Sequence, residues 1–332
     1  MGSMLGNVKE LGEQISKSLK TSNIEKIKTN SNLVVVGMGG SGVAGDALRI
    51  FAEEKGITVD VIKDYSIPKI LINKEPHCLL ISYSGNTEET LYAFNQVSEL
   101  GLACTIVTSG GQLKEEAIGG EFPLIEIPSG YQPRAAFGFL LRAMMEFLDA
   151  FERSEENVNN CNEAKSFIDS LLDDEGNVFK RTKDLSSIIG SRTLLIYAGT
   201  PVTKVAACRL KTQINENAKS QAFIGELPEI HHNEILAWEG DKENSLNNFI
   251  VLFMRDINEH PQVSKRINLT KKVLEGKAHF LEDVTTKEES TLNQLLELVL
   301  YGDLISVYVA ELLNMVPEDI KIIEQVKELL KD

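Results

Sequence analysis

Three β-branched residues run directly into a cluster of glycines near the start of the chain. Val34–Val36 is typical of a buried strand, Gly37-Met-Gly-Gly-Ser-Gly42 of a tight turn, and the run that follows of a helix. Glycine lets the backbone approach a ligand closely, and the free N–H groups and the dipole of a helix N-terminus attract an anion. The sequence therefore predicts a strand–turn–helix unit that holds a phosphate on its turn.

One candidate ligand that would carry this phosphate is a dinucleotide. Three of these glycines have the G-x-G-x-x-G spacing of nicotinamide-binding turns, and an acidic residue, Asp60, follows on the next predicted strand. However, Asp60 falls inside the predicted strand 57–62, whereas a ribose-binding acid belongs at the end of its strand. A second anion-binding turn at residues 82–90 is also one more than a single pyrophosphate needs.

Short apolar strands alternate with helices along most of the chain, which predicts parallel βαβ units. Strands are predicted at 33–36, 57–62, 77–82, 102–107 and 124–127, and again at 193–197, 221–224, 249–254 and 278–281. We expect an α/β fold of two tandem, doubly wound parallel-sheet domains, 1–152 and 153–332, with the boundary in the polar stretch 153–165. Amphipathic helices are predicted over 5–28 and 317–330.

Composition excludes several classes of function. The 332 residues carry a formal net charge of −15, so the basic footprint of a nucleic-acid-binding protein is missing. The four cysteines are widely spaced without a C-x-x-C motif, which argues against a zinc site or a redox dithiol. We see no signal peptide and no apolar run near the ~20 residues of a spanning helix, and therefore expect a cytoplasmic protein without membrane contacts.

The second anion-binding turn is Ser82-Tyr-Ser-Gly-Asn-Thr-Glu-Glu-Thr90. The hydroxyls of Ser82, Ser84 and Thr87 leave a strand end and enter a helix N-terminus, where hydroxyls and backbone N–H groups match the oxygens of a phosphate monoester. The alternative is an ordinary helix cap with Thr87 at the N-cap position, but a cap needs only one hydroxyl. The turn therefore predicts a phosphate site.

Together the two turns resemble the sugar isomerase (SIS) domain, which binds sugar phosphates on a flavodoxin-like parallel sheet. The tandem of two such halves resembles the bifunctional phosphoglucose/phosphomannose isomerases over almost the whole chain. This resemblance implies an aldose–ketose isomerase that takes hexose 6-phosphates and needs neither metal nor nicotinamide as a cofactor. The phosphate-binding residues would be Gly39, Gly40, Ser41, Ser82, Ser84 and Thr87.

Two further residues match the catalytic motifs of that family. Arg134, in Pro133-Arg-Ala-Ala-Phe-Gly138, is a cation at a predicted helix start, where it opposes the helix dipole unless an anion is bound. Glu216, in Ile214-Asn-Glu-Asn-Ala-Lys219, is a carboxylate among small amides. The resemblance implies that Arg134 stabilises an enediolate and that Glu216 is the base, although by residue type alone each could be an ordinary surface side chain.

A histidine and a lysine complete the implied site. His232, in His231-His-Asn-Glu234, matches a histidine that helps to open the sugar ring from the partner subunit of a homodimer. The family usually has asparagine at the position of His231, and the segment has no H-E-x-x-H metal motif. Lys327 matches a C-terminal lysine that acts with the histidine, with Lys321 as the rival candidate.

Three other functions remain open at this level. A sugar-phosphate sensor without catalysis would need no Glu216, and many such sensors carry a basic DNA-binding arm that this chain lacks. The isomerase half of an amidotransferase would need a glutaminase domain. A nicotinamide-dependent enzyme remains possible from the opening glycines alone.

Overall fold

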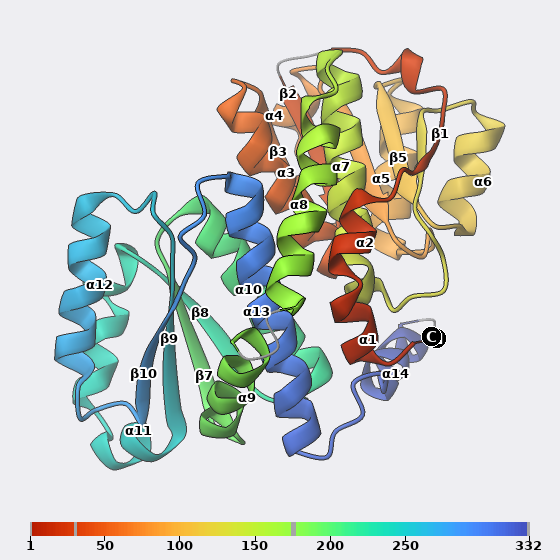
Figure 1. The fold of residues 1–332 in the computed structure, drawn as a ribbon. Helices are drawn as coiled ribbons and strands as arrows, with labels where there is room; N and C mark the ends of the chain where they lie inside the picture. Colours follow the sequence, from red (N-terminus) through yellow and green to blue (C-terminus); the bar gives the residue numbers. More distant parts are fainter. Residues whose placement is uncertain (1, 30–31, 174–176, 331–332) are drawn as a thin grey trace. The chain divides into compact units, whose positions relative to one another are not determined.

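The structure is a computed structural model that describes residues 2–29, 32–173 and 177–330. The chain forms two compact units, Met1–Leu171 and Leu172–Asp332. Each unit is built on one β-sheet whose strands alternate with helices along the chain (Figure 1). The predicted α/β class with two parallel sheets in tandem is therefore confirmed.

The first unit has a six-stranded sheet in the order β1-β6-β5-β4-β2-β3. Its strands are β1 (Lys20–Ser22), β2 (Asn32–Gly37), β3 (Thr58–Ile62), β4 (His77–Ser82), β5 (Cys104–Thr108) and β6 (Leu124–Glu126). All neighbours run parallel except β1, which pairs antiparallel with β6 at the edge. Every residue of β4 and β5 is buried, as expected for central parallel strands covered on both faces.

Helices cover both faces of this sheet. They are α3 (Gly39–Glu54), α4 (Lys69–Ile72), α5 (Glu88–Glu99), α6 (Gly111–Gly119), α7 (Phe137–Glu152) and α8 (Glu156–Asp173). Apolar side chains of α5 and α6 pack in one cluster with Val34, Leu80 and Ile106 of the sheet. On the opposite face, His77 of β4 contacts the ring of Phe147 of α7.

The prediction of a single helix over 5–28 is wrong. The segment contains α1 (Met4–Lys9), α2 (Leu11–Ser16), β1 and a 3₁₀ turn, η1 (Ile24–Lys26). The chain becomes extended at Lys17, and the backbone N–H of Leu19 donates to Glu146 Oε1 at 3.2 Å. Pairing of β1 with β6 then satisfies backbone groups that a continued helix would have satisfied locally, so tertiary contacts override the amphipathic pattern.

The division between the two units falls after Leu171, whereas the sequence predicted it after residue 152. The reason is α8, whose polar composition suggested a linker. Its residues Cys161, Ala164 and Ile168 are buried, and Asn162 Oδ1 accepts a hydrogen bond from Arg142 Nη1 at 2.9 Å. A narrow apolar stripe on a polar helix is thus enough to attach α8 to the first unit.

The second unit has four parallel strands in the order β10-β9-β7-β8. They are β7 (Thr193–Ala198), β8 (Ala222–Glu226), β9 (Phe249–Arg255) and β10 (Phe280–Thr285). The helices are α9 (Val178–Ile189), α10 (Pro201–Asn217), α11 (Lys242–Asn248), α12 (Pro261–Leu274), α13 (Thr291–Leu312) and α14 (Lys321–Leu329), with 3₁₀ turns η3 (Glu229–His232) and η4 (Glu234–Glu239). α10 packs along α13, and α12 packs on the face that carries Tyr197 and Phe253.

All four cysteines are free thiols. Cys78 and Cys104 are register neighbours on β4 and β5, and burial raises the pKa of each thiol to about 12. Such thiols remain protonated and unreactive at neutral pH. Among the helices in the described ranges, none is long and apolar enough to cross a lipid bilayer.

Candidate active site

The first predicted turn joins β2 to α3 at the carboxyl edge of the first sheet. α3 begins at Gly39, whose φ of 51° lies in the left-handed region that favours glycine. The N-cap residue, Met38, makes no side-chain cap hydrogen bond. Ser41 N donates to the Met38 carbonyl oxygen at 3.0 Å, so in this 16-residue helix the N–H groups that an anion could meet are those at its very start, at Gly39 and Gly40.

The second predicted turn leaves the neighbouring strand β4 and enters α5. The Oγ atom of Ser82 lies 2.8 Å from the Oγ1 atom of Thr87 and accepts a hydrogen bond from Gly85 N at 3.1 Å. Ser84 Oγ accepts from Asn86 N at 3.2 Å. Thr87 is the N-cap residue of α5, yet its side chain caps nothing. The helix-cap interpretation is therefore wrong for the Thr87 hydroxyl, which joins a hydroxyl pair instead.

A neighbouring loop holds this turn in shape. A Cβ atom on Gly85, which has a φ of 70°, would stand 1.8 Å from the carbonyl oxygen of Gly110. A Cβ atom on Gly111 would stand 2.3 Å from the carbonyl oxygen of Ser84. Ser109 Oγ also donates to the carbonyl oxygen of Tyr83 at 2.7 Å. The two loops are thus closely packed, and only glycine permits the approach.

Arg134 lies against the first of these turns. It is buried in a 3₁₀ turn, η2 (Pro133–Ala136), that precedes α7. Its Cα atom lies 3.8 Å from the place where a Cβ atom on Gly40 would stand, and Nη1 donates to Gln132 Oε1 at 3.3 Å. The first unit therefore brings together seven predicted site residues. They are Gly39, Gly40, Ser41, Ser82, Ser84, Thr87 and Arg134.

Sequence reasoning missed a lysine, Lys63, beside the phosphate cradle, the name used here for the two turns at residues 37–42 and 82–90. The Lys63 side chain, at the carboxyl end of β3, crosses the first turn of α3, and its Cε atom lies 2.9 Å from the position of a Cβ atom on Gly42. Its Nζ atom pairs with Asp46 Oδ2 at 2.5 Å. A lysine directly after a parallel strand is the only signal that could have identified it, and that signal is weak.

Glu216 lies in the last turn of α10 and is partly exposed. The buried face of α10 is fixed to α13 by a polar network. Asp303 accepts hydrogen bonds from Arg209 Nη2 at 2.6 Å and from Gln213 Nε2 at 3.1 Å. Desolvation raises the pKa of Asp303, and the neighbouring Arg209 opposes that shift. The helix that carries Glu216 is therefore held by specific contacts and not by apolar packing alone.

The C-terminal segment reaches the same end of α10. Lys219 Nζ donates to the carbonyl oxygen of Glu216 at 2.6 Å and to that of Pro317 at 3.1 Å. From Pro317 the chain continues into α14, which carries both candidate lysines. Lys321 Nζ is held by Asp319 Oδ2 at 2.8 Å, and Lys327 lies exposed in the last turn of α14.

His232 does not come near Glu216 within the second unit. α10 ends at Asn217, just before β8 begins, whereas His232 follows the other end of β8. The five residues of β8 span about 13 Å at ~3.3 Å per residue. Glu216 therefore lies near the amino end of β8 and His232 beyond its carboxyl end. His232 is exposed.

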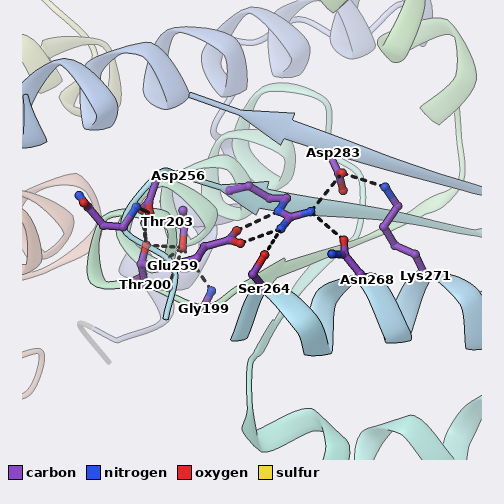
Figure 2. A network of polar contacts seen from close by, with 11 residues as sticks. Gly199, Thr200, Thr203, Asp256, Glu259, Ser264, Asn268, Lys271 and Asp283 are labelled. Carbon is purple, nitrogen blue, oxygen red and sulfur yellow. Dashed lines mark hydrogen bonds and ion pairs between the residues drawn. The ribbon is translucent and has the colours of Figure 1, made fainter. Parts of the chain in front are cut away.

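In the second unit, the turn at the same place in the fold joins β7 to α10 and contains Thr200. Thr200, at the N-cap of α10, accepts from Thr203 N at 3.2 Å, and its hydroxyl donates to the buried carboxylate of Asp256, which follows β9 (Figure 2). Desolvation raises the pKa of Asp256. The N-cap hydroxyl of α10 is thus engaged by side chains of the same unit, Thr203 and Asp256.

Comparisons with known proteins identify similar sequences and structures. Residues 180–330 match the model of the bacterial phospho-glucose isomerase C-terminal SIS domain. The chain is 35% identical over 305 residues to a bifunctional phosphoglucose/phosphomannose isomerase of Aquifex aeolicus (strain VF5). The aligned residues cover 90% of this chain and 90% of that relative. It is 27% identical over 328 residues to a D-glucosamine-6-phosphate 4-epimerase of Sulfolobus acidocaldarius, which covers 98% of this chain and 97% of that relative.

Solved structures share the fold. The tagatose-6-phosphate ketose/aldose isomerase of Escherichia coli superimposes with a TM-score of 0.68 at 13% identity, over 95% of this chain and 94% of that one. The sequence identity to the Aquifex relative extends over both units. The chain therefore belongs to the family of bifunctional phosphoglucose/phosphomannose isomerases.

Proposed function

We propose that this protein is an aldose–ketose isomerase that interconverts glucose 6-phosphate and mannose 6-phosphate with fructose 6-phosphate. The observation that carries the proposal is the pair of turns at adjacent strand ends, where an uncapped helix start meets the Ser82–Thr87 hydroxyl pair. A phosphate monoester offers the oxygens that these donors need. Membership of the isomerase family supplies the reaction class.

In this proposal the substrate phosphate binds to the backbone and hydroxyl donors of the first unit. Its ligands are Gly39, Gly40, Ser41, Ser82, Ser84 and Thr87. Lys63 adds positive charge beside the first turn, although Asp46 neutralises part of it. The phosphate fixes the orientation of the sugar, so that catalytic groups need act only on C1, C2 and the ring oxygen.

The chemical steps are proton transfers. His232 and Lys327 move protons between the ring oxygen and the C1 oxygen and so open the ring. Glu216 then takes the C2 proton of the aldose and returns it to C1 through a cis-enediolate, while Arg134 stabilises the negative charge. Glucose and mannose phosphates differ only at C2, so both give the same enediolate. The proton moves between adjacent carbons, and the scheme calls for no cofactor.

We further propose that the protein is a homodimer in which His232 acts in the site of the partner subunit. The support is the location of Glu216 and His232 at opposite ends of β8, about 13 Å of strand apart. The His232 imidazole of a second copy, which is exposed, would then reach the site that contains Glu216, because His232 of the same chain lies too far away. Such reciprocal donation is a natural property of a two-fold symmetric interface.

Product identity is the direct test. Fructose 6-phosphate is incubated with the protein in the presence of a chelator and without nicotinamide, and the sugar signals are followed by NMR. We expect both glucose 6-phosphate and mannose 6-phosphate to form. Fructose 6-phosphate that binds but stays unchanged would favour a sensor. Turnover of glucosamine 6-phosphate alone would favour the chemistry named for the Sulfolobus relative.

A further inference from the structure

The two adjacent histidines of η3 have different surroundings. His232 is exposed, whereas His231 is partly buried against α12. His231 Nε2 lies 2.7 Å from Thr270 Oγ1, and Arg266 Nη1 lies 2.9 Å from His231 Nδ1. Both ring nitrogens of His231 are therefore engaged by α12.

These contacts determine the tautomer of His231. A guanidinium can only donate, so Nδ1 must accept from Arg266 and carries no proton. The proton of the neutral ring is then on Nε2, which donates to Thr270 Oγ1. The Thr270 hydroxyl in turn donates to the carbonyl oxygen of Arg266 at 2.8 Å. Every donor in this closed chain has one acceptor, and such chains strengthen their members.

The charge balance agrees with a neutral ring. Desolvation, with the nearby charges of Arg266 and His232, lowers the pKa of His231. A protonated ring would lose its acceptor and place a cation against the Arg266 guanidinium. His231 therefore has no free nitrogen for acid–base chemistry, which leaves His232 as the histidine of this pair that can transfer protons.

The turn is anchored on both sides of His232 as well. Ile230 is buried in the apolar cluster of the second unit with Tyr197 and Trp238. Glu234 Oε1 accepts a hydrogen bond from the Tyr197 hydroxyl at 2.6 Å. His231 adds a third attachment, to a different element, directly before His232.

We infer that His231 is a positioning residue, whose neutral Nε2–H imidazole bridges Thr270 and Arg266 of α12 and thereby fixes the backbone that presents His232. The inference rests on the proposed function for its effect on turnover. A loose turn would offer His232 in many orientations, and small misplacements of catalytic groups cost up to about 100-fold in rate. Because the phosphate ligands lie elsewhere, binding of the substrate would be little affected.

The test compares variants that keep or remove each contact. His231→Leu removes both, His231→Asn keeps an acceptor near Arg266, and Thr270→Val removes only the hydroxyl. We expect kcat to fall about tenfold to 100-fold in His231→Leu with KM nearly unchanged. The losses in His231→Asn and Thr270→Val should be smaller, and Thr270→Ser should restore the wild-type rate. His279→Leu, which removes an exposed histidine of the same unit, is the matched control.

A spectroscopic measurement accompanies the kinetics. In ¹⁵N-histidine-labelled protein, we expect the His231 signals of a neutral ring with an unprotonated Nδ1 at pH 7, and a change of these signals in Thr270→Val. A wild-type kcat in His231→Leu, or an Nδ1–H or charged ring in the spectrum, would overturn the inference. Absence of turnover in the wild-type protein would instead contradict the proposed function, and the spectrum would still decide whether the bridge exists.

Discussion

The hydroxyl oxygens of Ser82 and Thr87 lie 2.8 Å apart at the start of α5. Neither hydroxyl caps the helix, because the Thr87 side chain makes no cap contact and Ser82 Oγ accepts from Gly85 N within the turn. The pair lies at the N-terminus of α5, where the helix dipole favours a bound anion. This geometry is the basis for assigning the phosphate of a hexose ester to the turn.

Removal of the Thr87 hydroxyl should weaken substrate binding. In Thr87→Val we expect KM for fructose 6-phosphate to rise roughly tenfold to 100-fold, because a hydrogen bond to a charged group contributes ~1.5–3 kcal/mol. The matched control is Thr90→Val, since Thr90 Oγ1 is buried in the same helix with no hydrogen-bond partner among the described residues. Steady-state kinetics decide the matter. An unchanged KM in Thr87→Val would remove this hydroxyl from the phosphate site.

A second prediction concerns acid stability. Burial lowers the pKa of His77 from 6.5 to about 4, and Lys28 adds to the shift. The folded state therefore resists protonation of a group that the unfolded chain protonates readily. The free energy of unfolding should fall as the pH drops from 6.5 towards 4, by roughly 3 kcal/mol in total if nothing else titrates.

The urea midpoint followed by circular dichroism between pH 7 and pH 4.5 measures this dependence. His77→Gln removes the titrating ring and should flatten the pH profile, even if it lowers the midpoint at pH 7. Replacement of the exposed His279 by Gln is the control and should leave the profile as it is. An unchanged slope in His77→Gln would show that other groups cause the acid sensitivity.

The buried ion pair beneath the Glu216 helix should dominate the stability of the second unit. Asp303→Asn removes the carboxylate that Arg209 Nη2 contacts at 2.6 Å, and breaking a buried pair in this way costs about 3–5 kcal/mol. The only tryptophan, Trp238, is buried in this unit and reports its unfolding by fluorescence. Asp319→Asn, which breaks an exposed pair with Lys321, should barely move the midpoint. Equal effects of the two changes would contradict this view of α10.

Subunit complementation tests the origin of the histidine. Glu216→Gln and His232→Ala should each be nearly inactive alone. If His232 acts in the site of the partner subunit, a mixed dimer has one intact site, and equilibrated mixtures should recover up to roughly a quarter of wild-type activity. Size-exclusion chromatography confirms exchange of subunits. Exchange without recovered activity would mean that both residues act from one chain.

The strands were predictable because buried parallel strands consist of uninterrupted apolar runs. β2 and β4 extend close to their predicted ends for this reason. The segment 5–28 was not predictable, since β1 exists only where β6 offers a partner. The attachment of α8 likewise depends on a few buried residues that its polar composition conceals.

The geometry of the two turns in the candidate site was predictable because it depends on residues close together in the sequence. The spacing of glycines and hydroxyls is by itself enough to indicate both turns of the cradle. The internal carboxylate of Asp256 was not predictable, because Thr200 and Asp256 follow different strands and meet only through the sheet. The bridge from His231 to α12 depends in the same way on a tertiary contact that leaves no local pattern.

Transfer of solvent hydrogen to carbon is the most direct test of the central claim that Glu216 is the base of an enediolate isomerase. Fructose 6-phosphate is converted in D₂O, and deuterium at C2 of the aldose products is measured by NMR for the wild-type protein, Glu216→Gln and the control Glu226→Gln. We predict deuterium at C2 in the wild-type and Glu226→Gln reactions, and a loss of turnover of about 10²–10⁴-fold in Glu216→Gln with substrate binding retained. Isomerisation at an undiminished rate in Glu216→Gln would contradict the account.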